Sequence, residues 1–309
     1  MTITQLEYVV ALDTHRNFAT AASHCHVTQP TLSMQLKKLE EELGTVLFDR
    51  NKKPVAPTDV GEQVIEQARV SLRSLKQIDA LVRHHSGDLS GTLRMGIIPT
   101  LSPYLLPRVL PPLAKRYPNL TLEIEELLSD QIVDKLHKDQ LDVALWVARE
   151  RENHLVHVPL FYERFLVYLP DGHVYSEQKV ALSELDMKQM WLLKEGHCFR
   201  DQVVSFCGGV SESNHHANFL SGSLETLKNI VDQHYGFTLL PELAVFDLPE
   251  ERRKNVRSFK NISPLRAVSL TYHQRFCKDK MVQMLKTEIR STVPQELLED
   301  SRGQVVRWK

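Results

Sequence analysis

Two cysteines in the second half of the chain have surroundings that suit thiol chemistry. Cys198 lies in the segment EGHCFRDQ, next to His197 and close to Arg200 and Asp201, and Cys207 follows nine positions later in SFCGG. Gly196 can end the preceding strand and let a helix begin near Cys198. A helix N-terminus and nearby cations stabilise the thiolate, which is the reactive form of cysteine. Asp201 opposes this effect unless it holds Arg200 in place. The pattern predicts a reactive thiol at Cys198 and leaves the balance of charges around it open.

A buried structural role is the alternative, because most free cysteines are small core residues. That role suits Cys207, which lies beside Phe206, better than it suits Cys198 with its polar neighbours. Cys25 and Cys277 have no clear reactive neighbourhood and are expected to be structural. Four cysteines in 309 residues make a poor disulfide framework, which fits a protein of the reducing cytosol.

The spacing of Cys198 and Cys207 sets a condition on any bond between them. Nine residues of helix separate two Cα atoms by about 13 Å, whereas a disulfide needs them within about 7 Å. If this stretch is helical when reduced, disulfide formation must unravel the helix. Gly208 and Gly209 would ease that rearrangement, and the change of order could be read elsewhere in the protein.

The segments around the cysteines alternate between strand-like and helical patterns. This alternation predicts a mainly parallel sheet covered on both faces, and about 200 residues leave room for two lobes. Residues 294–309 are polar and are expected to form a flexible tail. The strand-like segments are 93–98, 120–127, 141–147, 165–170, 190–195, 237–241 and 266–272, and the helical ones are 102–117, 130–140, 223–233 and 278–292.

The first 58 residues are predicted to form short helices and a basic turn. A helix from Thr28 to about Leu43 has leucines on one face, and its opposite face has small polar residues early and lysines later. Such a helix suits the DNA major groove, and the basic segment 48–58 suits a wing on phosphate. The residues expected to contact DNA are Thr28, Gln29, Pro30, Thr31, Ser33, Met34, Lys37, Lys38, Arg50, Lys52 and Lys53.

Bulk charge does not decide the question of DNA binding. The net charge is -1, and residues 1–58 hold six Lys or Arg against six Asp or Glu. The alternative is an ordinary helical hairpin with a solvated run of charge, and residue spacing alone leaves both interpretations open.

Residues 59 to about 85 are predicted to form one long helix. Apolar or small residues recur in steps of four and three, which is the seam of a coiled coil. The length favours a dimerising linker helix over a helix packed on its own domain, and SGDLSG at 86–91 then forms a hinge. The seam residues are Val64, Ala68, Ser71, Leu75, Ile78 and Val82.

Residues 18–61 resemble the winged helix-turn-helix of LysR-type transcription regulators. The matching residues are Ala21, Ala22, Thr28, Gln29, Pro30, Ser33, Leu39, Glu40, Leu43, Gly44, Leu47, Phe48, Arg50, Thr58 and Gly61. The resemblance implies an all-α winged helix-turn-helix domain, a long linker helix, and an α/β regulatory domain of two periplasmic-binding-protein-like lobes. The implied bounds are 1–58 for DNA binding, 59–87 for the dimerisation helix, 88–162 with 268–293 for lobe I, 163–267 for lobe II with the cysteines, and 294–309 for the tail.

The cysteine segment resembles the OxyR-type peroxide sensors within this family, through GHCFRDQ, the second cysteine, and Ile98-Pro99-Thr100. The resemblance implies that Cys198 is peroxidatic and Cys207 resolving, and that their reversible disulfide activates oxidative-stress genes. Thr100 and Ser129 are expected to hold peroxide. His197, Arg200 and Asp201 are expected to support the site.

The expected partners are double-stranded promoter DNA, hydrogen peroxide, RNA polymerase and a cellular thiol reductant, for a cytoplasmic homodimer or homotetramer. No cofactor, metal or membrane contact is expected. His24, Cys25 and His26 are adjacent and point in different directions, and no apolar run approaches the roughly 18–20 residues of a membrane span. Two other functions stay open: a LysR-type regulator that binds a small metabolite between its lobes, and a thiol peroxidase. An enzyme would leave the DNA-binding segment unexplained, so a non-enzymatic regulator is favoured.

Overall fold

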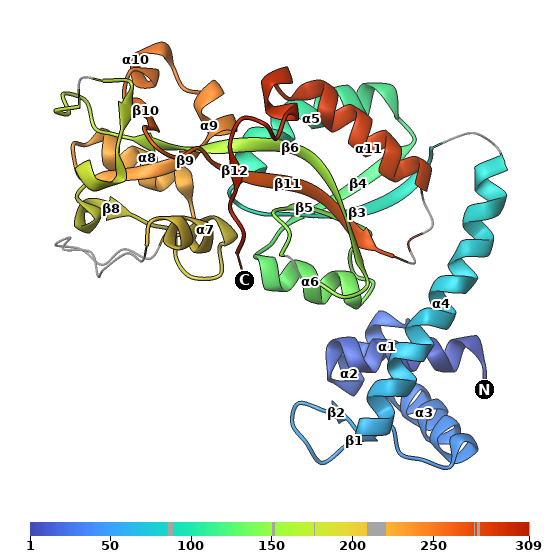
Figure 1. Ribbon diagram of the computed structural model, residues 1–309. Helices are drawn as coiled ribbons and strands as arrows, with labels where there is room; N and C mark the ends of the chain where they lie inside the picture. The colour runs from blue at the N-terminus through green and yellow to red at the C-terminus, as the bar shows by residue number, and fades with distance from the viewer. Residues whose placement is uncertain are drawn as a thin grey trace. The chain divides into compact units, whose positions relative to one another are not determined.

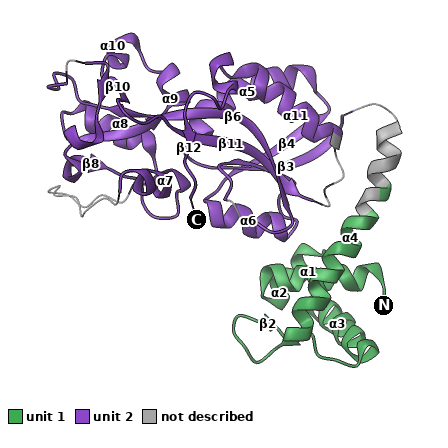
Figure 2. Ribbon diagram, viewed as in Figure 1, with its two compact units in different colours: residues 1–88, 275–277 green, residues 89–274, 278–309 purple. Residues whose placement is uncertain are grey.

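The computed structural model describes residues 1–85, 89–149, 152–175, 177–208, 221–274, 276 and 279–308. Gly209 and Cys277 therefore lie outside the described residues. The chain divides into an N-terminal unit, residues 1–88 with 275–277, and a regulatory unit, residues 89–274 with 278–309 (Figure 2). Among the described residues, no helix has both the length and the apolar character needed to cross a membrane.

The N-terminal unit is built from capped helices whose first residues the sequence specifies. Before α1, the Thr2 hydroxyl accepts the Gln5 N–H and the Gln5 side chain accepts the Thr2 N–H. Asn17 caps α2, and Thr28 caps α3, as helix N-caps commonly do. The helices are α1 (Ile3–His15), α2 (Phe18–His24), α3 (Gln29–Leu43) and α4 (Asp59–His85), and the wing strands are β1 (Phe48–Asp49) and β2 (Ala56–Pro57).

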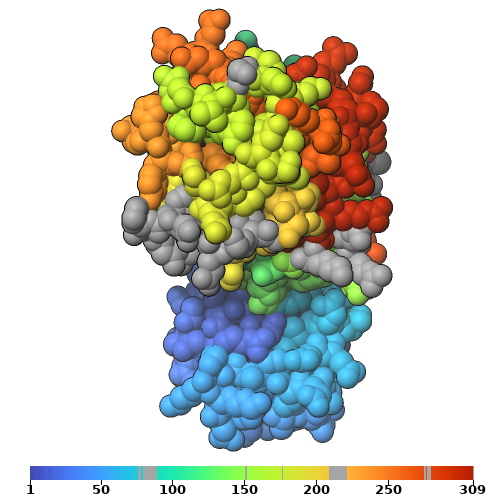
Figure 3. Space-filling view, turned by 60° about the vertical axis from the view of Figure 1, so that its left-hand side comes forward, coloured from blue at the N-terminus to red at the C-terminus, as the bar shows by residue number. Residues whose placement is uncertain are grey.

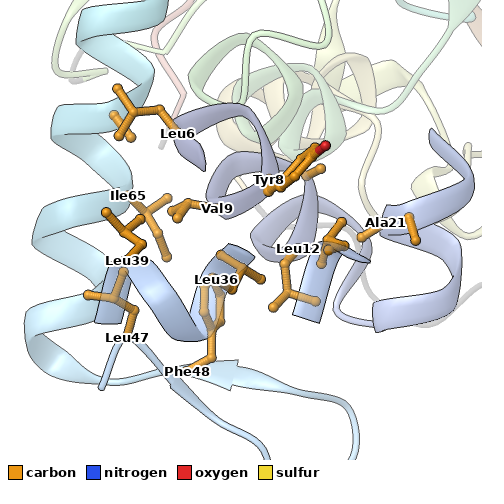
Figure 4. Close-up of a cluster of buried hydrophobic side chains, with 14 residues drawn as sticks. Leu6, Tyr8, Val9, Leu12, Ala21, Leu36, Leu39, Leu47, Phe48 and Ile65 are labelled. Atoms are coloured by element: carbon orange, nitrogen blue, oxygen red, sulfur yellow. The ribbon is translucent and has the colours of Figure 1, made fainter. Parts of the chain in front are cut away.

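Leucines from these helices form one core, in which Leu36 and Leu39 of α3 meet Leu12 of α1 and Ile65 of α4 (Figure 4). The predicted apolar face of α3 is thus buried, except that Leu43 at its end is 40% exposed. Strands β1 and β2 pair antiparallel on either side of the basic turn, which gives the wing the form expected from sequence.

Only the first residues of the predicted coiled-coil seam on α4 pack within the N-terminal unit. Ala68 is buried in the core and Val64 packs against it, whereas Leu75 is 37% and Ile78 is 58% exposed. The Val82 side chain lies outside the described part. The interpretation as a free seam along the whole helix is wrong for the first turns, because α1 packs on them. The later turns keep exposed apolar side chains.

Charged substitution of the later seam should separate subunits. Replacing both Leu75 and Ile78 with Glu should give a monomer that binds an inverted-repeat site at least about tenfold more weakly, because such a site needs two heads at fixed spacing. Analytical ultracentrifugation and gel-shift titration measure the two effects. The folded state should survive, since both side chains are already exposed. A dimer with wild-type affinity would show that α4 is not the dimer contact.

The regulatory unit has two lobes that share two long strands (Figure 1). In lobe I, β3 (Gly91–Ile97) pairs parallel with β4 (Leu120–Glu126) and β5 (Val143–Trp146). The chain passes between the lobes through β6 (Leu155–Tyr168) and β11 (Pro264–His273), which pair antiparallel over most of their length. The helices of this lobe are α5 (Ser102–Arg116), α6 (Ser129–His137) and α11 (Asp279–Thr292).

Lobe II contains the segment with the two cysteines. Two of its strands, β9 (Phe237–Pro241) and β10 (Val256–Phe259), pair antiparallel with β6. The prediction of a mainly parallel sheet is therefore wrong around β6, because the lobes are joined by extended strands rather than by helical crossovers. The elements are β7 (Lys179–Val180), β8 (Met190–Trp191), α7 (Cys198–Phe206), α8 (Leu224–Asp232), β9 (Phe237–Pro241), α9 (Glu242–Phe246), α10 (Glu250–Arg253) and β10 (Val256–Phe259).

The C-terminal residues are packed instead of forming the flexible tail expected at 294–309. A short 3-10 helix, η3 (Gln295–Leu298), buries Leu297. Strand β12 (Gln304–Val305) pairs parallel with the start of β11, and Trp308 is only 5% exposed. The expectation was wrong because few apolar residues mark this segment, yet two of them, Leu297 and Trp308, are buried in the regulatory unit. The C-terminal residues, in red, form part of the visible surface of the regulatory unit (Figure 3).

Candidate functional site

Cys198 is the first residue of α7 and lies where the two lobes meet. Gly196, with φ of +90°, turns the chain into the helix, and His197 is the N-cap. The thiol is 2% exposed. Two groups of lobe I lie close to it, the backbone N–H of Val147 and the hydroxyl of Ser129, and both favour a negative charge on Sγ. The helix N-terminus predicted for this cysteine is confirmed.

Burial dominates the electrostatics of Cys198. It raises the pKa of the thiol, while the positive charge of Arg266, the Ser129 hydroxyl and the Val147 N–H all lower it, and Asp201 raises it. The net direction is upward, so the thiol form prevails at neutral pH in this conformation. The opposing effect of Asp201 agrees with the sequence analysis. The cation that acts most strongly on the sulfur, however, is Arg266, which is remote from Cys198 in the sequence.

Arg266 of β11 is fully buried and links several parts of the site. Its Nε donates to Glu163 Oε1 at 2.7 Å, and its Nη1 and Nη2 donate to the hydroxyl and the carbonyl of Thr100 at 2.9 and 3.0 Å. Its guanidinium carbon lies 5.3 Å from the ring centroid of Phe199. The sequence carried a signal, because a buried strand that contains an arginine must pair it. Thr100 thus reaches the site through Arg266.

Several buried polar atoms on α6 and α7 have no hydrogen bonds within the described part of the chain, and one of them, the Ser129 hydroxyl, lies beside the thiol. Among the described residues, Ser129 Oγ, His197 Nε2 and Gln202 Oε1 have no hydrogen-bond partner. The Ser129 hydroxyl is near enough to favour the thiolate but does not meet full hydrogen-bond geometry with it. Native proteins rarely bury polar groups unpaired. The unpaired Ser129 hydroxyl beside the sulfur can therefore hydrogen-bond a small polar molecule.

The remaining predicted support residues divide into two kinds. Burial, and to a lesser extent the charge of Lys194, lowers the pKa of His197, so its imidazole is neutral and supplies no positive charge to the thiol. Arg200 pairs with Glu195 at 3.7 Å and with Asp201 at 4.0 Å. Arg200 therefore compensates the neighbouring carboxylates. The structure brings Cys198, Ser129, His197 and, through Arg266, Thr100 together.

Cys207 lies at the opposite end of α7, as its C-cap residue. Burial raises the pKa of its thiol to about 12. All of residues 198–206 are helical, so the two Cα atoms are separated by about 13 Å of helix. Cys198, Cys207 and Cys25 are all free thiols in this conformation.

In the N-terminal unit, most of the predicted DNA-contacting side chains are exposed, and Thr31 and Ser33 are half-buried. Arg50 differs from the other predicted DNA-contacting residues, because its side chain is engaged within the protein. It pairs with Glu40 at 2.7 Å and lies 5.4 Å from the Phe18 ring centroid, while Glu40 also accepts the Leu47 N–H. Arg50 therefore braces the wing against α3, and Lys52 and Lys53 remain as the exposed basic residues of the turn.

Metal binding has no support in the part of the chain that the structure describes. There, no group of three or more His, Cys, Asp or Glu side chains is placed to hold an ion. The rings of His15 and His24 lie 4.8 Å apart, and burial together with the nearby His24 lowers the pKa of His15. Cys25 is half-buried, and burial raises its pKa.

Two family models together match nearly the whole chain. Residues 3–62 match the bacterial regulatory helix-turn-helix protein of the lysR family, and residues 86–293 match the LysR substrate binding domain. A hydrogen peroxide-inducible genes activator of Dickeya chrysanthemi is 39% identical over 279 residues, 88% of this chain and 89% of its own length. The DNA-binding transcriptional dual regulator OxyR of Escherichia coli K12 is 38% identical over 277 residues, again 88% of this chain and 89% of its own.

Solved structures agree with these relatives. A full-length OxyR variant from Pseudomonas aeruginosa is 35% identical, with a TM-score of 0.78, covering 95% of this chain and 99% of that one. A peroxide-bound OxyR variant from Corynebacterium glutamicum is 28% identical, with a TM-score of 0.62, covering 96% of this chain and 94% of that one. The chain therefore belongs to the LysR family of bacterial transcriptional regulators, and within that family it is similar to the OxyR-type proteins.

Proposed function

We propose that this protein senses hydrogen peroxide through Cys198 and is switched by a reversible disulfide between Cys198 and Cys207. The observation that carries the proposal is the buried thiol beside Arg266 and beside the Ser129 hydroxyl, which has no hydrogen-bond partner among the described residues. Relatives named hydrogen peroxide-inducible genes activators support the choice of peroxide. The alternative, a regulator that binds a metabolite between its lobes, does not explain why a cysteine lies beside a buried arginine.

The first chemical step oxidises Cys198. Its thiolate attacks one oxygen of the peroxide, the O–O bond breaks, and the departing hydroxide takes up a proton to leave as water. Thr100 and Ser129 orient the peroxide. Arg266 stabilises the negative charge on the thiolate and on the departing oxygen. From the sequence alone, Arg200 was the arginine expected to support the thiol. The product is a sulfenic acid on Cys198.

The second step forms the disulfide. The Cys207 thiolate attacks the Cys198 sulfur, the S–O bond breaks, and a second water leaves. Two thiols and one peroxide thus yield one disulfide and two waters, and a cellular thiol reductant reverses the change. With a pKa of about 12, Cys207 is a poor nucleophile inside the intact helix. Unwinding of α7 brings the sulfurs within reach and exposes Cys207 to solvent.

The output of the switch is a change in promoter binding. Rearrangement of residues 198–222 alters lobe II, and through it the packing of subunits in a cytoplasmic homodimer or homotetramer. The spacing of the DNA-binding units then changes, which alters contacts with promoter DNA and RNA polymerase. We favour subunit packing as the route from lobe II to DNA, because binding to a palindromic site depends on the distance between the two DNA-binding units.

Mass spectrometry of the peroxide-treated protein tests the switch. Wild-type protein treated with stoichiometric peroxide and trapped with a thiol alkylating agent should yield a peptide pair linked through Cys198 and Cys207. Dithiothreitol should release the pair. A change in DNA binding or transcription without this linkage would reject the disulfide and favour the metabolite-binding regulator. Steady turnover of peroxide with an external thiol would favour a peroxidase.

The wing makes a separate prediction for DNA. Replacing Lys52 and Lys53 together with Ala should weaken binding similarly on all sequences and reduce the slope of log K against log salt by about 1 per lysine, since each lysine neutralises a phosphate. Fluorescence anisotropy at several salt concentrations measures the slope.

Two further variants serve as comparisons for the double lysine variant. Gln29→Ala should change sequence preference and leave the salt slope near that of the wild type, because base-edge contacts carry sequence information. Arg50→Ala should lower stability as well as affinity, since Arg50 pairs with Glu40. An unchanged salt slope in the double lysine variant would contradict the wing assignment.

A further inference from the structure

We propose that residues 303–308 form a strap that stabilises the reduced thiol site, and that disulfide formation releases this strap. The inference rests on the proposed function, because the release is driven by the Cys198–Cys207 bond. Figure 1 shows the C-terminal end of the chain running from β12 toward α7 and α6, the helices that carry Cys198 and Ser129. The strap is fixed to the regulatory unit at several points, each close to a group that acts on the Cys198 sulfur.

The first point is β11, the strand that carries Arg266. The Gln304 N–H donates to the Ser263 carbonyl and the Val306 N–H donates to the Leu265 carbonyl, each at 2.8 Å. Gly303 makes this approach possible, since a Cβ at that position would lie 2.0 Å from the Ser263 oxygen. The strap thus pairs with the residue directly before Arg266.

The second point is α7 itself. Gln202 lies one helical turn after Cys198, on the same side of the helix, and its side chain is fully buried. Its Nε2 donates to the Val306 carbonyl at 3.0 Å. This bond ties the strap to the helix that must unwind before Cys207 can reach Cys198. An unwound α7 cannot keep Gln202 in this position.

The third point is the segment after β5. The guanidinium carbon of Arg149 lies 4.8 Å from the ring centroid of Trp308, and Arg149 also pairs with Asp130, the residue after Ser129, at 2.5 Å. Arg149 is two residues beyond Val147, whose N–H favours a negative charge on the Cys198 sulfur. The strap therefore contacts the elements that supply Arg266, Val147 and Cys198 itself.

The strap is docked in a way that permits release. Among the described residues, Trp308 Nε1 is buried without a hydrogen-bond partner, and an unpaired buried donor opposes burial. Both side chains of β12 are exposed to solvent, so the strand can separate from β11 without exposing a buried side chain of its own. Because the strap binds the helical form of α7 and not the unwound form, it favours the dithiol over the disulfide by mass action.

Two measurements on the full-length protein test the strap. In hydrogen exchange followed by mass spectrometry, the peptide spanning 303–308 should be protected in the reduced protein and should exchange at least about tenfold faster after oxidation. In glutathione buffers, Gly303→Ala and Trp308→Ala should shift the dithiol–disulfide equilibrium about tenfold toward the disulfide, a midpoint potential about 30 mV lower. Trp308→Ala keeps the backbone pairing, so it serves if Gly303→Ala does not fold.

Matched variants separate the strap from a general loss of packing. Trp308→Phe retains a ring for Arg149, and Val305→Ala changes an exposed side chain of the same strand, so both should stay within about twofold of the wild-type equilibrium. Midpoints that agree across all variants, or a tail that stays protected after oxidation, would overturn the strap while leaving the disulfide switch intact. Failure of the wild-type protein to form the Cys198–Cys207 bond would instead overturn the proposed function and, with it, the strap.

Discussion

Cys198→Ser should abolish the transcriptional response to hydrogen peroxide. The serine hydroxyl fits the same buried space beside Ser129 and Val147, but it cannot attack the O–O bond at neutral pH, so no oxidised form arises. DNA binding by the reduced form should be unchanged, since Cys198 lies in the regulatory unit. Reporter transcription with and without peroxide, together with sulfenic-acid trapping, measures the loss. A peroxide response of normal size in this variant would exclude Cys198 as the sensor.

Cys207→Ser should separate the two chemical steps. Cys198 remains oxidisable, so it should stall as a sulfenic acid or pair with an external thiol, and the intramolecular linkage should be absent. Cys25→Ser and Cys277→Ser provide matched controls and should respond as the wild type does. A normal, reversible response in Cys207→Ser without any mixed disulfide would mean that sulfenic acid formation alone operates the switch.

The second large effect is expected at Arg266, whose positive charge lowers the pKa of Cys198. Replacing both Arg266 and Glu163 with Gln avoids a buried unpaired carboxylate, which would cost about 3–5 kcal/mol of folding stability. An opposite charge at close range shifts a pKa by about 1–3 units. A higher pKa leaves less thiolate at neutral pH, but each thiolate is then a stronger nucleophile, which offsets part of the loss. The oxidation rate at neutral pH should therefore fall about 4- to 40-fold.

The pH dependence identifies the cause of this change. Burial already places the pKa of Cys198 above its ordinary value, so the oxidation rate should rise with pH through the neutral range in the wild type. Removing the Arg266 charge raises the pKa further, so the rise should extend to higher pH and the ratio of the wild-type rate to the variant rate should fall as the pH increases. Stopped-flow oxidation of a Cys207→Ser background follows this single step.

Arg200→Gln supplies the matched comparison for the buried arginine. Arg200 contacts Glu195 and Asp201, so its loss should change the oxidation rate by less than about twofold. A large effect at Arg200 together with none at Arg266 would reverse the assignment and restore the role that the sequence alone suggested.

Local signals in the sequence correctly predicted where α3 begins and ends. Thr28 is the N-cap of this helix and Leu43 is its last residue, as expected, because caps depend on neighbouring residues in the chain. Strand β9 has the bounds that its apolar run indicated. The family resemblance, with its linker helix and two lobes, depended on the same kind of information, namely residue types at short spacing.

Long-range pairing decided what the sequence could not. The 14 residues of β6 were predicted only in part, since the strand is stabilised by partners on different segments of the chain. The tail was expected to be flexible because its burial depends on β11 and α7.

For the site, the sequence by itself selected Cys198, its position at a helix start, and the condition that a helix must unwind for Cys207 to reach it. It chose Arg200 as the cation because Arg200 is near in sequence. Only the tertiary structure placed Arg266, 68 positions away, at the sulfur. Charge acts through space and is strengthened by burial, so the folded arrangement of β11, α6 and α7 decides which arginine acts on the thiol.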